Sequence, residues 1–213
     1  MKPPELIRVK YDDADAATAS HAPTASMEKL GRLYWYLDEN IHQDPYIRWK
    51  KDDNTERGRQ DLETALNNRK TYTLQQVKSL YGKSEEIRRE LGSYAADYYI
   101  ARSVSHFDSA VEQNGLMTLS RQYMEKHYLA TKLRDLGIQL PASDAIAISP
   151  KAQALLETLA SLGDDTLGII FAKQTATVNV LGHILSVHPL TRHRFRYGTM
   201  VGISRTATRS SDL

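Results

Sequence analysis

Apolar residues recur at helical spacing through most of the first 137 residues, and this pattern constrains the fold more than any other feature of the chain. In the segment "MEKLGRLYWYLDENI", six of them repeat at helical spacing: Met27, Leu30, Leu33, Tyr34, Leu37 and Ile41. Similar segments follow one another with short polar connections. Short connections between amphipathic helices are typical of a helical bundle. The sequence therefore predicts a mainly α fold over this length.

Local signals mark where these helices begin and break. Asp44 precedes Pro45, and proline suits the first turn of a helix because its missing N–H has no intrahelical partner there. Thr73 is the expected N-cap of the next segment, which is too long for one average helix. Gly82 and Gly92 lie inside that segment, and we expect it to break or kink at one of them.

The pattern changes after about residue 145. Ser149 and Pro150 predict the start of a helix, and "LGIIF" at 167–171 is a short apolar run of the kind found in strands buried on both faces. A helical segment, "TATVNVLGHILSVH", and a second strand-like run, "RYGTMVGIS", come next. Strand, helix and strand in this order predict a βαβ unit with parallel strands. An isolated strand is also expected near the start of the chain, at "LIRVKY".

The charge of the chain is unevenly distributed. Residues 1–165 carry 22 Lys or Arg and 25 Asp or Glu, whereas residues 166–213 carry six basic residues and one acid. A segment that is basic and almost free of acids suits a polyanion, because its contacts to phosphates release counterions. A basic surface that only keeps the protein in solution is the alternative explanation.

The composition excludes several classes of protein. The sequence contains no cysteine, which rules out disulfides and thiolate metal sites and fits a reducing compartment. No apolar run approaches the roughly 20 residues that a membrane span needs, and the first residues, "MKPPELIRVKYDD", do not resemble a signal peptide. We expect an intracellular protein, in the cytoplasm, with no membrane contact.

Three motifs of catalytic or metal-binding proteins are present only in part. Glu157 and Asp164 fit a ribonuclease III pattern, E-x-L-x-x-L-G-D, but Ala160 replaces a second glutamate and the later acids are missing, so a metal-dependent ribonuclease is disfavoured. "YGKSEE" lacks the earlier glycine of a phosphate-binding loop. Glu39 and His42 form a single E-x-x-H pair, and a di-iron bundle needs two. No catalytic residue and no metal site are predicted.

Three stretches together resemble a known family: "ELGSYAADYYI" at 90–100, "SPKAQALLETL" at 149–159, and "GIIFAKQTATVNVLGHILSVHPLTRHRFRYGTMVGIS" at 168–204. In this order they are similar to the helicase region of Dicer proteins, most of all the fungal Dicer-like proteins. The resemblance implies three parts: residues 1–11 as the end of the first motor domain, 12–140 as a helical insertion domain, and 145–213 as the start of a second, RecA-like motor domain, incomplete here.

The resemblance also implies a function. In this family the helicase region engages double-stranded RNA in RNA silencing and antiviral defence, and the insertion domain can dock an accessory double-stranded-RNA-binding protein. The phosphate-binding loop and the acidic ATPase box are absent from this sequence, so ATP and Mg²⁺ would be used only by an intact parent, and this chain alone would hydrolyse neither ATP nor RNA. The implied RNA contacts, together with the arginines of the basic segment, are Lys173, Arg192, Arg194, Arg196, Gly202, Ser204 and Arg205.

The family's helicase motif IV usually has an arginine where this sequence has Thr175, which weakens the case for an RNA contact at that position. A helical protein–protein adaptor without RNA binding is the alternative function, with residues 24–137 as its interface. The aromatic residues Tyr34, Trp35, Tyr36, Tyr98 and Tyr99 are predicted to lie in the core and rim of the bundle and not to stack on bases.

Overall fold

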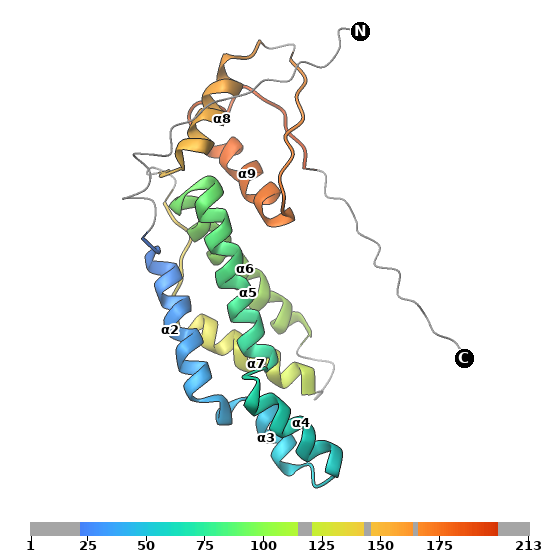
Figure 1. Ribbon diagram of the computed structural model, residues 1–213. Helices are drawn as coiled ribbons and strands as arrows, with labels where there is room; N and C mark the ends of the chain where they lie inside the picture. Colours follow the sequence, from blue (N-terminus) through green and yellow to red (C-terminus); the bar gives the residue numbers. More distant parts are fainter. Residues whose placement is uncertain (1–21, 115–120, 143–145, 164–165, 200–213) are drawn as a thin grey trace, which may run out of the picture.

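The computed structural model describes residues 22–114, 121–142, 146–163 and 166–199. These residues are mainly α-helical, as predicted, and no strand occurs among them. Figure 1 shows a long lower bundle with a smaller helical unit stacked on its upper end. The helices are α2 (Ala25–Glu39), the short 3-10 helix η1 (Ile41–Gln43), α3 (Pro45–Asp52), α4 (Glu56–Asn67), α5 (Tyr72–Leu91), α6 (Ser93–Asn114), α7 (Arg121–Arg134), α8 (Pro150–Ser161) and α9 (Thr175–Val187).

Short polar side chains begin most of these helices. Asp44 accepts a hydrogen bond from the backbone N–H of Tyr46 at 2.9 Å, with Pro45 in the first turn of α3, so the predicted start is confirmed. Ser149 caps α8 in the same way, through the N–H of Ala152 at 3.0 Å. The predicted cap at Thr73 is wrong: α5 begins two residues earlier, and Thr71 caps it.

The helix break is at Gly92 and not at Gly82. Helix α5 runs straight through Gly82, whereas Gly92 has φ +105°, a conformation that only glycine adopts readily. A Cβ atom on Gly92 would lie 2.6 Å from the Cα of Ile148. The connection before α8 thus passes directly over the α5–α6 turn, which requires a residue without a side chain.

The bundle has one core of its own. Residues from α2, α3, α5, α6 and α7 meet there, and the helices contact one another through fully buried side chains. Its largest fully buried side chains come from α2, η1, α3, α5, α6 and α7: Met27, Leu30, Ile41, Ile47, Val77, Ile100 and Leu129.

A second core joins the upper unit to the bundle. Ile87 near the end of α5 and Ala95 near the start of α6 are buried against Leu156 of α8 and Ile184 of α9. The connection before α8 is also held by backbone hydrogen bonds: the N–H of Ser149 donates to the carbonyl of Leu91 at 3.0 Å. Helices α5 and α6 therefore take part in both cores.

The predicted strand at 167–171 is not formed. The segment is extended but pairs with no other part of the described chain, and its side chains face outward: Leu167 is 96% exposed, Ile169 77% and Phe171 90%. A strand is stable only when neighbours satisfy its backbone groups and cover its apolar faces, and the described residues supply neither. The βαβ unit is therefore not seen, although its helix is present as α9.

The rest of the βαβ prediction falls largely on residues that the structure does not describe. Residues 196–199 form no strand, and residues 200–204 of the second predicted strand lie outside the described part, as does the strand expected at 6–11. No helix among the described residues is both long and apolar enough to cross a membrane.

Candidate nucleic-acid interface

The turn after α9 carries the arginines of the basic segment. Thr191 is buried at its centre, with 1% exposure, and its hydroxyl donates a hydrogen bond to the carbonyl of Leu185 at 3.0 Å. The ring Nδ1 of His188 accepts from the N–H of Leu190 at 3.3 Å, and burial lowers the pKa of this histidine. These contacts fix the backbone of the turn, so the residues that follow Thr191 leave it in a defined direction.

Three arginines project from this turn and the residues after it. Arg192, Arg194 and Arg196 are exposed, and none of them forms an ion pair with another described residue. Arg194 donates to the carbonyl of Leu162 at 3.4 Å, which holds it near the end of α8. Guanidinium groups without a carboxylate partner can bind phosphate oxygens in pairs.

Lys173 lies at the other end of α9 and is already paired. Its Nζ is 3.4 Å from Oε1 of Glu86 on α5, although the lysine side chain is 89% exposed. The same glutamate accepts a hydrogen bond from Gln174, the residue that precedes α9. The positive charge of Lys173 is therefore partly balanced within the protein.

The structure does not gather the predicted residues at one point. Lys173 and Arg192 flank a helix of 13 residues, which spans about 20 Å. The chain that follows the arginine turn passes back along α9: a Cβ atom on Gly182 would lie only 3.2 Å from Cγ2 of Thr199. Gly202, Ser204 and Arg205 lie outside the described residues. Such an arrangement suits separate contacts along an extended polyanion better than a compact pocket.

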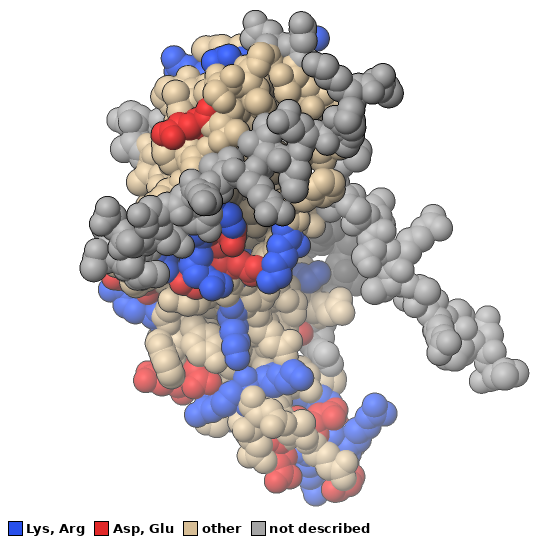
Figure 2. Space-filling model, turned by 45° about the horizontal axis from the view of Figure 1, so that its top comes forward, with Lys and Arg blue, Asp and Glu red and all other residues tan. Residues whose placement is uncertain are grey.

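In the part of the chain that the structure describes, no carboxylate cluster accompanies these basic residues. Among the described residues, no group of histidine, aspartate and glutamate side chains could hold a metal ion. Glu157, from the ribonuclease III pattern, accepts a hydrogen bond from Gln153 on the surface of α8, and Asp164 lies outside the described part. In the view of Figure 2, basic and acidic side chains are intermixed over the bundle, while the upper unit is mostly neutral, with basic groups at its edge and an acidic group on its face.

An aromatic cluster between α6 and α9 was not anticipated. The ring of His183 stacks on Tyr98, with 3.7 Å between ring centroids and 2° between ring planes. Its Nε2 is 3.1 Å from the hydroxyl of Tyr94, and burial, followed by the charge of Arg102, lowers the histidine pKa. Tyr98 was expected in the core or rim of the bundle, but nothing in the sequence links it to a residue more than 80 positions away.

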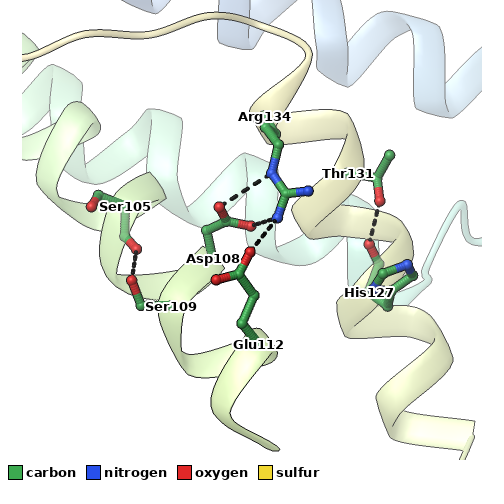
Figure 3. A network of polar contacts seen from close by, with 7 residues as sticks. All are labelled: Ser105, Asp108, Ser109, Glu112, His127, Thr131 and Arg134. Carbon is green, nitrogen blue, oxygen red and sulfur yellow. Dashed lines mark hydrogen bonds and ion pairs between the residues drawn. The ribbon is translucent and has the colours of Figure 1, made fainter. Parts of the chain in front are cut away.

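Arg134 forms a second unanticipated contact, between α6 and α7 (Figure 3). Its Nε donates to Oδ2 of Asp108 at 3.2 Å, and its Nη2 donates to Glu112 at 3.0 Å. Hydrogen bonding with Asp108, then the charge of that carboxylate, raises the pKa of Arg134. The spacing of Asp108 and Glu112 by four residues is a signal of two acids on one helix face, but it does not identify their partner.

Comparison with known proteins gives a consistent result. The chain is 34% identical over 199 residues to Dicer-like protein 2 of Neurospora crassa, covering 93% of this chain and 12% of that protein. It is 37% identical over 211 residues to Dicer-like protein 2 of Neosartorya fischeri, covering 94% and 14%, and 35% identical over 212 residues to that of Aspergillus fumigatus, covering 96% and 15%. The chain thus spans less than one sixth of the length of these relatives. No protein-family model matches it, and no solved structure matches it significantly.

Proposed function

Because this chain is homologous to one region of the fungal Dicer-like proteins, we propose that it forms part of a Dicer-type helicase region and engages double-stranded RNA. Residues 12–140 are assigned to the helical insertion domain and residues 145–213 to the start of the second motor domain. The observation that carries the proposal is the arginine turn after α9, where Arg192, Arg194 and Arg196 are exposed and not paired with carboxylates of the described chain.

Recognition by such a turn would depend on shape and charge. The deep major groove of A-form RNA is closed to side chains, so proteins bind its duplex mainly through phosphates and 2′-hydroxyls. Arginines on a fixed turn can make phosphate contacts without reading the bases. Lys173 would join them only by exchanging Glu86 for a phosphate, so we expect it to contribute less than the arginines.

The exposed segment at 167–171 supports a motor-domain assignment. Leu167, Ile169 and Phe171 are turned to solvent, and neighbouring exposed apolar side chains of this kind often mark a surface that another segment covers. In the longer protein, we infer, this segment becomes a buried strand when the remaining strands of the motor domain pair with it. ATP and Mg²⁺ would act only in that intact protein, in RNA silencing or antiviral defence in the cytoplasm, and this chain by itself would be inactive.

Binding of a double-stranded RNA stem to the full chain at low ionic strength tests the proposal. The variant Arg192→Glu/Arg194→Glu/Arg196→Glu should lose at least tenfold in affinity, because each guanidinium contact to phosphate is worth about 1 kcal/mol or more. A matched control reverses three exposed lysines of the bundle, Lys51, Lys70 and Lys78, and changes the net charge equally. Equal losses in both variants, or no binding by the wild type, would reject the assignment of the turn.

A protein–protein adaptor is a second candidate, and one surface favours it. Trp35 is 64% exposed and Tyr36 40% exposed on α2, and the Nζ of Lys132 on α7 lies 4.8 Å from the centroid of the Tyr36 ring. Exposed tryptophan and tyrosine are typical of interface hot spots. Trp35 was predicted to lie in the core or rim of the bundle; with 64% exposure it lies on the surface and outside the core. If the chain is an adaptor, Trp35→Ala should abolish binding of its protein partner. The same variant should leave the affinity for RNA unchanged.

A further inference from the structure

The contact between α6 and α9 includes the ring of a histidine, which can gain a proton in mildly acidic solution. His183 stacks on Tyr98 at 3.7 Å and is parallel to Tyr94, with ring centroids 6.2 Å apart. Its Nε2 lies 3.1 Å from the Tyr94 hydroxyl. The half-buried imidazole therefore packs against two tyrosines of α6, and this contact is part of the joint between the upper unit and the bundle.

Few charges surround this ring. Arg102, one turn beyond Tyr98 on α6, is the charged residue that acts on it. Helix α5 contributes Glu86, which is engaged by Lys173 and Gln174 at the start of α9. At the α8 side, Lys151 pairs with Glu90. None of the carboxylates in the described part of the chain forms a hydrogen bond or an ion pair with His183.

We propose that His183 is a protonation-dependent latch between α6 and α9: the neutral ring strengthens the packing of the upper unit on the bundle, and the imidazolium weakens it. A proton on this ring would place a positive charge in a partly buried site beside Arg102, with no carboxylate to balance it. The face of Tyr98 would attract the imidazolium, which opposes release. Burial and the charge of Arg102 both destabilise the imidazolium in the closed joint, and both effects are lost when the joint opens.

The sign of the pH dependence follows from the histidine pKa. Burial and Arg102 lower it in the closed joint, whereas the open joint exposes the ring and returns its pKa to about 6.5. The joint is therefore fully stable above about pH 6.5 and weakens as the pH falls toward the lowered value. Over that interval the ratio of open to closed molecules rises about tenfold per pH unit.

Opening would move specific parts of the chain. Helices α8 and α9 share a core with Ile87 and Leu91, so release would expose this core and free the upper unit to change its orientation. The arginine turn follows α9 directly and would move with it. The latch therefore sets where the basic turn lies relative to the bundle, whether or not that turn binds RNA.

A distance measurement on the full chain tests the latch. The sequence contains no cysteine, so Ser105→Cys on α6 and Ser161→Cys at the end of α8 provide two unique sites for spin labels. Lowering the pH from 7.5 to 5.5 should broaden the distance distribution in this background. His183→Phe keeps the aromatic stack and cannot be protonated, so the distribution should stay narrow at both values, and His42→Phe on η1 should behave as the wild type.

An NMR titration of the wild-type chain tests the proposal even if His183→Phe does not fold. The NMR signal of the His183 ring in the wild-type chain should titrate below pH 6.5, and Arg102→Gln should move its midpoint upward. A His183 midpoint above 6.5, or a distance distribution that broadens equally in His183→Phe, would overturn the proposal.

Discussion

Replacing Gly92 by alanine should destabilise the protein more than almost any other change of one methyl group. Gly92 has φ +105° and ψ 177°, a region that side chains occupy at a cost of about 1–3 kcal/mol. The new Cβ would also lie 2.6 Å from both Cα of Ile148 and the backbone N of Ser149, so the connection to α8 must move.

The size of the effect depends on what that movement breaks. Three hydrogen bonds hold the connection, and each is worth about 0.5–1.5 kcal/mol. The N–H of Ser149 donates to Leu91 at 3.0 Å, its hydroxyl donates to Glu90 at 2.7 Å, and the N–H of Tyr94 donates to Ala147 at 3.2 Å. Strain and the loss of all three hydrogen bonds together give a loss of about 2.5–7.5 kcal/mol in the free energy of unfolding.

The matched control is Gly82→Ala, in the same helix. No atom lies within 4 Å of a Cβ at Gly82, and the residue is exposed inside α5, so alanine should stabilise the helix by about 0.5–1 kcal/mol. Urea unfolding followed by circular dichroism measures both variants. The reasoning fails if Gly92→Ala unfolds at the same urea concentration as Gly82→Ala or the wild type.

Three other changes have expected results. Leu156→Ala empties a site with 0% exposure in the second core and should cost about 2–5 kcal/mol in urea unfolding, whereas a loss below about 1 kcal/mol would argue against tight packing of α8. Asp44→Ala removes the α3 cap and the acceptor of the buried Thr73 hydroxyl, and should cost about 2–4 kcal/mol by the same assay; an unchanged midpoint would contradict this. Phe171→Ser, at a 90% exposed position, should leave the unfolding free energy within about 0.5 kcal/mol by the same assay, and a loss above about 1 kcal/mol would contradict the exposure of this side chain.

The helix starts that depend on residues close together in the sequence were predictable. Asp44 with Pro45, and Ser149 with Pro150, identify helix starts because a cap is a contact over three residues. The cap at Thr73 was misplaced by two residues, since Thr71 and Thr73 are the same residue type and a helix end is set by small differences. The choice of Gly92 over Gly82 depends on Ile148, which is distant in sequence.

The strand at 167–171 was predicted from composition, and its absence has a physical explanation. An apolar run such as "LGIIF" is compatible with a strand, but a strand also needs partners, which the described chain does not supply.

The candidate site was predictable only in part. Charge asymmetry pointed to Arg192, Arg194 and Arg196, whereas the buried Thr191 that fixes their turn and the Glu86 that engages Lys173 are long-range features of packing.

The salt dependence of affinity for a double-stranded RNA stem tests the central claim most directly. Each phosphate contact contributes about 0.9 to the slope of log affinity against log salt concentration on a duplex. The account predicts that the Arg192→Glu/Arg194→Glu/Arg196→Glu variant has a slope about two to three smaller in magnitude than the wild type, while the Lys51, Lys70 and Lys78 variant keeps the wild-type slope. Identical slopes for all three proteins would contradict it.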